Sequence, residues 1–172
     1  QWYANGQLFL KGKYSEDMLI GIWDQWYKNG NKNFTGAYNE SNKDGDWVYY
    51  SPDGKDSSIV SYLNGKPNNG KKIEWYDNGE KESEIIYKGG GIKGPVTYWY
   101  DNGKKKLVEN YMNNQLDGFL IKWNQDGKKY LKQKYSNGDL REEKKYTYYD
   151  LGQIESTKEY IYDSSDKIMN EI

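Results

Sequence analysis

Regularly spaced aspartates are the residues of this sequence that could do chemistry. They recur among Gly and Asn residues, at Asp53, Asp77, Asp101, Asp126 and Asp150. Paired carboxylates can act as general acid and base, but the sequence has no histidine or cysteine to serve as base or nucleophile. Aspartate in a turn is also explained by a hydrogen bond to nearby backbone. We therefore expect five turn residues and no enzymatic activity.

One segment superficially resembles a calcium-binding loop: Asn42-Lys43-Asp44-Gly45-Asp46. It lacks the regular oxygen ligands of such loops and the bidentate glutamate at their twelfth position. We expect it to be a loop before a strand, and we expect the protein to need no metal ion and no other cofactor.

Aromatic residues are spaced as regularly as the aspartates. Seven turn glycines follow one another every 24 or 25 residues, at Gly6, Gly30, Gly54, Gly79, Gly103, Gly127 and Gly152. Four residues before each stands an aromatic residue: Trp2, Trp26, Tyr50, Trp75, Trp99, Trp123 and Tyr148. Eight residues after each stands a tyrosine. Cross-strand aromatic pairs contribute about 0.2 to 1 kcal/mol each, so the column from Trp2 to Tyr148 is predicted to be a structural ladder between hairpins.

The spacing divides the chain into seven repeats, near residues 1–20, 21–44, 45–69, 70–93, 94–117, 118–141 and 142–160. Short segments such as 23–27 and 96–100 are rich in aromatic and β-branched residues and are bounded by Gly, Asn and Asp, which is typical of strands. We therefore predict an all-β fold, an elongated single-layer antiparallel meander of stacked hairpins. Residues 161–172 depart from the pattern. We expect either a disordered tail or a short capping helix containing Ile168, Met169 and Ile172.

Turn chemistry predicts the register of each hairpin. Residues 51–55, Ser-Pro-Asp-Gly-Lys, favour a three-residue type I turn with a G1 bulge. With that register, even offsets from the glycine share one face, which places Trp26, Phe34 and Tyr38 on an apolar stripe. The opposite face is expected to be mostly wet. Aromatic residues on that wet face are less needed for folding and form the candidate contact surface for a ligand, namely Trp23, Tyr27, Trp47, Tyr76 and Tyr100.

Composition limits the class of partner. Formal net charge is -1, with 25 basic and 26 acidic residues, so no global field attracts nucleic acid. Only 35% of residues are hydrophobic and mean hydropathy is -1.17, but 7 Trp and 19 Tyr argue against disorder. The sequence contains no apolar run long enough for a transmembrane helix and no visible signal peptide. Because Gln1 falls within a repeat, we expect a segment to precede it, and both a cytoplasmic and an exported location stay open.

The repeat resembles that of a known family. The pattern Gly21-x-Trp23-x-x-Trp26-Tyr27-x-Asn29-Gly30, followed by Lys32 and Tyr38, is similar to the bacterial variant of the MORN repeat. It recurs at residues 70–87, 94–111 and 118–135, and it is broken by Ser51, Lys72, Lys144 and Lys145. The resemblance implies a curved sheet of stacked hairpins that serves as a contact surface for proteins or membranes. Many bacterial relatives are labelled as antitoxin-like.

Two classes of binding function follow. The leading hypothesis is a non-enzymatic scaffold that binds a protein partner through one face of the sheet, as an antitoxin or immunity-type component. The alternative is a surface module whose aromatic columns bind a glycan, a choline-like group or a lipid. An exposed sheet end is also a template for another strand, which predicts edge-to-edge dimerisation.

Overall fold

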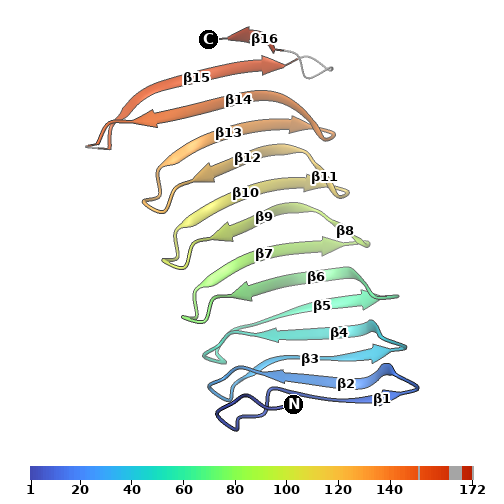
Figure 1. Ribbon diagram of the computed structural model, residues 1–172. Coiled ribbons are helices and arrows are strands. Elements are labelled where there is room, and N and C mark those ends of the chain that lie inside the picture. The colour runs from blue at the N-terminus through green and yellow to red at the C-terminus, as the bar shows by residue number, and fades with distance from the viewer. Residues whose placement is uncertain (151, 163–167, 172) are drawn as a thin grey trace. The chain divides into compact units, whose positions relative to one another are not determined.

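The computed structural model describes residues 1–150, 152–162 and 168–171. These residues form one open antiparallel sheet in which strands linked by hairpins follow one another in chain order (Figure 1). None of them belongs to a helix, so the described part of the chain has no helical segment able to cross a membrane. The predicted all-β meander is confirmed.

The chain divides into two compact units, Gln1–Gly91 and Ile92–Ile172. The strands of the N-terminal unit are β1 (Leu10–Ser15), β2 (Met18–Trp26), β3 (Lys32–Asn39), β4 (Asn42–Tyr50), β5 (Ser57–Leu63), β6 (Lys66–Trp75) and β7 (Lys81–Lys88). The two-residue strand β8 (Gly91–Ile92) pairs with β7. The strands of the C-terminal unit are β9 (Gly94–Trp99), β10 (Lys105–Met112), β11 (Gln115–Leu116), β12 (Gly118–Trp123), β13 (Lys129–Ser136), β14 (Asp139–Tyr148), β15 (Ile154–Tyr162) and β16 (Ile168–Glu171).

Three-residue turns close the hairpins that contain the repeated glycines. The backbone N–H of Gly30 donates to the carbonyl of Tyr27 at 3.0 Å, and the N–H of Tyr27 donates to the carbonyl of Asn31 at 2.8 Å. Gly30 has φ 89°, a conformation that favours glycine. The same pair of hydrogen bonds recurs at Gly6, Gly79, Gly103, Gly127 and Gly152.

Two-residue turns link one hairpin to the next. Both residues of each have positive φ, which is the type I′ geometry that matches strand twist. The pairs are Glu16 with Asp17, Glu40 with Ser41, Asn64 with Gly65, Gly89 with Gly90, Asn113 with Asn114, and Asn137 with Gly138. Because the turn is completed at Ser41, residues 42–46 belong to β4, and the expected loop there is wrong.

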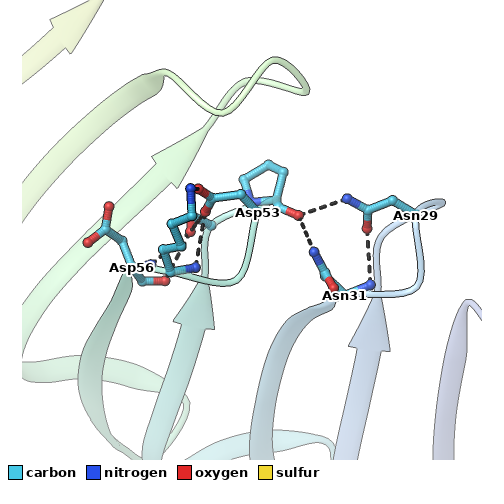
Figure 2. Close-up of polar contacts among 7 residues, drawn as sticks. Asn29, Asn31, Asp53 and Asp56 are labelled. Carbon is cyan, nitrogen blue, oxygen red and sulfur yellow. Dashed lines mark hydrogen bonds and ion pairs between the residues drawn. The ribbon is translucent and has the colours of Figure 1, made fainter.

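The third repeat has a different turn from the one predicted. The N–H of Ser51 donates to the carbonyl of Asp56 at 2.9 Å, so this loop is one residue longer than the others. Strands β4 and β5 pair without a register shift, whereas the β2–β3 pairing skips Asn33, the third residue after its turn glycine. The extra loop residue therefore replaces the bulge, and both hairpins reach the same register. The carbonyl of Pro52 in this loop accepts from Nδ2 of Asn29 and of Asn31, each at 2.8 Å, which ties two successive turns together (Figure 2).

The bulge, or the extra loop residue that replaces it, changes which residues share a face. Trp47 pairs with Val60 and Tyr49 pairs with Ser58, so odd offsets before the glycine lie with even offsets after it. The expectation that even offsets share a face on both strands is wrong, because one extra residue reverses the alternation on one strand: a skipped residue in the β2–β3 hairpin and a longer loop in the β4–β5 hairpin. Trp23 and Trp47 accordingly lie on the buried face. Trp47 is 0% exposed and Trp23 is buried, so their predicted place on the wet face is wrong.

Aromatic side chains dominate the core of the N-terminal unit. Trp47, Tyr49, Val60 and Tyr62 are buried together, with Phe34, Tyr38, Trp75 and Tyr87 packed around them. Ring contacts connect successive hairpins: Tyr14 to Trp23 at 5.1 Å, Trp23 to Tyr38 at 6.0 Å, Tyr38 to Trp47 at 5.0 Å, and Trp47 to Tyr62 at 6.0 Å between centroids. We call the side of the N-terminal unit that carries these residues its aromatic face.

Strands continue into the region predicted to be a tail. Strand β15 extends to Tyr162 and pairs with β14, and the backbone of residues 168–171 forms β16 beside β15. The helix considered for Ile168 and Met169 is therefore wrong. Ile172 lies outside the described residues.

Candidate functional site

A hollow of about 440 Å³ opens on the N-terminal unit. We call it the aromatic hollow. Its lining combines rings with polar side chains: Tyr3, Gln25, Tyr27, Asn33, Phe34, Tyr49, Lys72, Ile73, Glu74, Trp75, Asp77 and Glu82. A smaller hollow of about 260 Å³ shares Tyr3, Tyr27 and Asp77 with it.

Bulges place two of the polar side chains. Asn33 and Glu82 each stand three residues after a turn glycine, where the ladder skips one residue. A skipped residue has no partner opposite it, and the bulge re-aims its side chain. Both side chains line the aromatic hollow. The sequence signal for this is the residue type at the third position after each glycine.

Lys72 and Glu74 form an ion pair on β6 beside the hollow. Lys72 Nζ lies 2.6 Å from Glu74 Oε1, and Ser83 Oγ donates to Glu74 Oε2 at 3.0 Å. Burial alone would raise the pKa of Glu74, but the hydrogen bonds and charge of Lys72, with the Ser83 hydroxyl, hold that pKa below its usual value. Lys72 Nζ also lies 5.3 Å from the centroid of the Tyr49 ring. The carboxylate of Glu74 is therefore charged at neutral pH.

Four polar side chains of the hollow make no hydrogen bond or ion pair with any residue that the structure describes. They are Gln25, Asn33, Asp77 and Glu82. The local backbone bond expected of Asp77 is absent, because Asn78 Oδ1 accepts from the N–H of Glu80 at 3.0 Å in its place. That expectation is wrong for Asp77, and its carboxylate is left to face the hollow.

The same expectation holds at Asp53. Its Oδ1 accepts from the N–H of Lys55 at 3.1 Å and from Ser51 Oγ at 2.7 Å, as Figure 2 shows. The pKa of Asp53 is lowered by these two hydrogen bonds, most strongly by that from Ser51. All five repeated aspartates lie in turns. Whether each carboxylate accepts a local hydrogen bond depends on the residues next to it.

An ammonium group is enclosed by rings next to the hollow. Lys43 Nζ lies 3.9 Å from the Trp47 centroid, 5.0 Å from Tyr62, 5.4 Å from Tyr49 and 6.0 Å from Phe34. It donates to the Tyr49 hydroxyl at 2.9 Å. Burial and, to a smaller extent, the charge of Lys72 lower the pKa of Lys43 to about 8, and Glu74 opposes the change. Sequence reasoning missed this site because its rings come from three strands.

The structure places the five predicted contact residues in different surroundings. Tyr27 lines both hollows, and its hydroxyl donates to the carbonyl of Tyr50 at 2.8 Å. Burial, Asp77 and Tyr3 raise the pKa of Tyr27 to about 12. Tyr100 makes the corresponding bond to the carbonyl of Trp123 at 2.8 Å, and Tyr76 is half-buried. Trp23 and Trp47 are buried in the core.

The predicted ladder lies at the strand ends. Trp2 is 71% exposed, and the other six members are half-buried: Trp26, Tyr50, Trp75, Trp99, Trp123 and Tyr148. Trp75 packs against the core cluster and lines the hollow. Lys32 Nζ lies 5.8 Å from the Trp26 ring and 2.8 Å from Asp24. The continuous ring contacts of the N-terminal unit pass through Trp23 and Trp47.

Among the residues placed by the structure, no three carboxylates gather in a way that would hold a metal ion. Neither protein-family models nor curated proteins match this sequence. What the hollow offers chemically is ring faces beside unpaired hydrogen-bond acceptors. That combination suits a ligand that carries hydrogen-bond donors.

Proposed function

We propose that this chain is a non-enzymatic binding module that contacts a protein partner through the aromatic hollow of its N-terminal unit. One observation carries the proposal: Gln25, Asn33, Asp77 and Glu82 face the hollow without partners. A volume of about 440 Å³ is large enough for side chains of another protein.

The residue types of the hollow suit a protein interface. Tyrosine and tryptophan supply large rigid contact area and are enriched among the residues that dominate binding energy. Tyr27, Tyr49 and Trp75 supply such area here. Tyr49 and Trp75 are held by the packed core cluster, and the hydroxyl of Tyr27 is held by the carbonyl of Tyr50. Rigid walls reduce the entropy lost on binding.

The absence of histidine and cysteine from the sequence supports a binding role over catalysis. The likeness of the repeats to the bacterial MORN variant points the same way. On that basis we propose a partner of the toxin or effector class, with this chain as the antitoxin or immunity-type component.

A glycan is the second candidate ligand. The amides of Gln25 and Asn33 stand beside the rings of Phe34 and Tyr49, and sugars combine hydroxyl donors with an apolar ring face. Proteins use the same chemistry to hold partner side chains, so the two ligand classes have to be separated by experiment.

Panning a random peptide library displayed on phage against the intact chain tests the proposal. We expect enriched peptides that bind the wild type and bind the variant Gln25→Arg at least about tenfold more weakly, because the longer side chain fills the hollow. Lys122 occupies the corresponding position before Gly127, so this fold accepts a long basic side chain there. Ile59→Thr is the matched control, since Ile59 is half-exposed and neighbours Val60, which faces the core.

A glycan array probed with the same two variants covers the alternative. Peptide binding that Gln25→Arg leaves unchanged would contradict the proposed site. Glycan binding that is lost in Gln25→Arg, with no peptide enriched, would replace the protein partner by a sugar.

A further inference from the structure

We infer that the aromatic hollow takes a basic side chain of the partner, an arginine or a lysine, and that Lys72 is a tethered competitor for part of that site. This inference rests on the proposed function and names the chemistry of the partner. It depends on how the N-terminal unit already treats its own cations.

Two of the ammonium groups that lie over ring faces in this unit are at the hollow or beside it. Lys43 Nζ lies 3.9 Å from the centroid of Trp47, inside the core cluster. Lys72 Nζ lies 5.3 Å from the Tyr49 centroid, at the wall of the hollow. Cations are attracted to the negative face of an aromatic ring, and the attraction is stronger where water is excluded. These two contacts indicate that the exposed ring faces of the same unit favour a positive charge.

The charges of the hollow are unbalanced. Glu74, Asp77 and Glu82 line it together with one cation, Lys72. Lys72 is paired with Glu74 at 2.6 Å, whereas Asp77 and Glu82 make no ion pair among the residues that are described. Two carboxylates are therefore free to pair with a cation of a ligand, and aromatic rings line the same hollow. A guanidinium or ammonium group satisfies both the carboxylates and the rings, and a neutral sugar satisfies neither charge.

The charge of Asp77 affects the pKa of two tyrosines in the wall of the hollow. Its charge contributes to the raised pKa of Tyr27, whose main cause is burial. It contributes in the same way at Tyr3. Tyr3, Tyr27 and Asp77 also line the smaller hollow together, so a cation placed there would meet a carboxylate and aromatic rings.

Lys72 occupies a position that packing does not require to be basic. Four of its five equivalents, seven residues before a turn glycine, are Trp23, Trp47, Val96 and Leu120, and the fifth is Lys145 in the C-terminal unit. The Lys72 ammonium uses Glu74 Oε1 and the Tyr49 ring, both of which an incoming cation could also use. Removing the ammonium should therefore strengthen binding of a basic ligand. If Lys72 only stabilised the fold, its removal would not have that effect.

Titration of the intact chain with N-acetyl-arginine amide tests the inference. N-acetyl-citrulline amide is the matched ligand control, because citrulline has nearly the shape of arginine without its charge. Binding is followed by backbone amide chemical shifts and by tryptophan fluorescence. We expect the arginine probe to bind at least about tenfold more tightly than the citrulline probe, with shifts at Asn33, Asp77 and Glu82.

Two variants should move the affinity in opposite directions. Glu82→Gln should weaken the arginine probe by about threefold or more, and Lys72→Met should strengthen it by a similar factor. Glu155→Gln changes the same charge at an exposed site of the C-terminal unit and should leave affinity unchanged. A circular dichroism melt of each variant shows that it is folded.

Equal binding of the arginine and citrulline probes, or affinity unmoved by both Glu82→Gln and Lys72→Met, overturns the inference. Selected peptides that still depend on Gln25 would then leave the proposed function standing. If neither the arginine probe nor any selected peptide binds, the inference and the proposed function fail together.

Discussion

The indole of Trp47 lies against the backbone of Gly36, in space that a Cβ atom at residue 36 would fill. Trp23 lies on Gly12 in the same way. Neither glycine has positive φ, so the requirement for glycine at these positions is one of space and not of backbone conformation. Each indole reaches the strand that precedes its own because that strand has no side chain at the point of contact.

Gly36→Ala should destabilise the N-terminal unit by about 2 kcal/mol, because a fully buried ring has to move to admit one methyl group. Urea unfolding followed by tryptophan fluorescence measures the change. The double-mutant cycle with Trp47→Val is the control, since Val96 occupies the position equivalent to Trp47. Alanine at residue 36 should cost far less when the indole is gone, and an equal cost in both backgrounds would show that ring contact is not the cause.

Tyr27→Phe should destabilise the chain by about 1 kcal/mol, since the half-buried carbonyl of Tyr50 loses its hydroxyl donor. Tyr14→Phe is the comparison, because Tyr14 is 63% exposed and its ring keeps its contact with Trp23. Chemical denaturation of both variants gives the difference. If both lose the same stability, the hydroxyl bond between successive hairpins does not stabilise the fold.

Lys43 should make stability rise with pH between about 8 and 10. Burial lowers its pKa to about 8 in the folded chain, whereas an unfolded lysine titrates near 10.4. In that interval the unfolded chain binds more protons, so the free energy of unfolding increases with pH. Between pH 7 and 9.5 the wild type should gain roughly 1 kcal/mol relative to Lys43→Met, after allowance for solvent screening.

Lys55→Met is the control, because the side chain of Lys55 is 82% exposed. The difference in unfolding free energy between the wild type and Lys55→Met should not rise with pH. A wild type that loses stability against Lys43→Met over the same range would mean that the four rings hold the ammonium more strongly than burial opposes it. Measurements stay below pH 10, where tyrosines begin to ionise.

How much of this fold was predictable is best seen at Asn33 and Trp47. Glycine and aromatic spacing predicted strands, turns and their order, because these depend on local conformational preference. The faces were not predictable from the turn alone, because the ladder skips Asn33 and so reverses the alternation before the turn. That one residue moves Trp23 from the predicted surface to the core, and the extra loop residue of the third repeat does the same for Trp47.

The candidate site depended on contacts that spacing does not encode. Asp77 resembled a turn residue, and only the structure shows that Asn78 takes the local backbone bond and leaves its carboxylate free. The aromatic surroundings of Lys43 come from β3, β4 and β5, which meet through long-range pairing. Sequence reasoning recognised aromatic richness but could not assign it to particular neighbours.

In the C-terminal unit, Glu143 should make the fold sensitive to acid. Its buried carboxylate accepts from Gln133 Nε2 at 2.6 Å and pairs with Lys145 Nζ at 2.9 Å. Burial would raise the pKa of Glu143, but Lys145 and Gln133 outweigh it and hold the pKa below its usual value. The stabilisation by Glu143 is therefore complete above the unfolded pKa, near 4.3, and is lost as pH falls through the lower folded value.

Hydrogen exchange of the β13 and β14 amides between pH 6 and 3 measures this loss of stability. We expect protection to fall more steeply in the wild type than in Glu143→Gln, by about 1 kcal/mol over the range. Exposed Glu155→Gln should follow the wild type, and parallel curves for wild type and Glu143→Gln would show that the Glu143 charge is not what holds these two strands together.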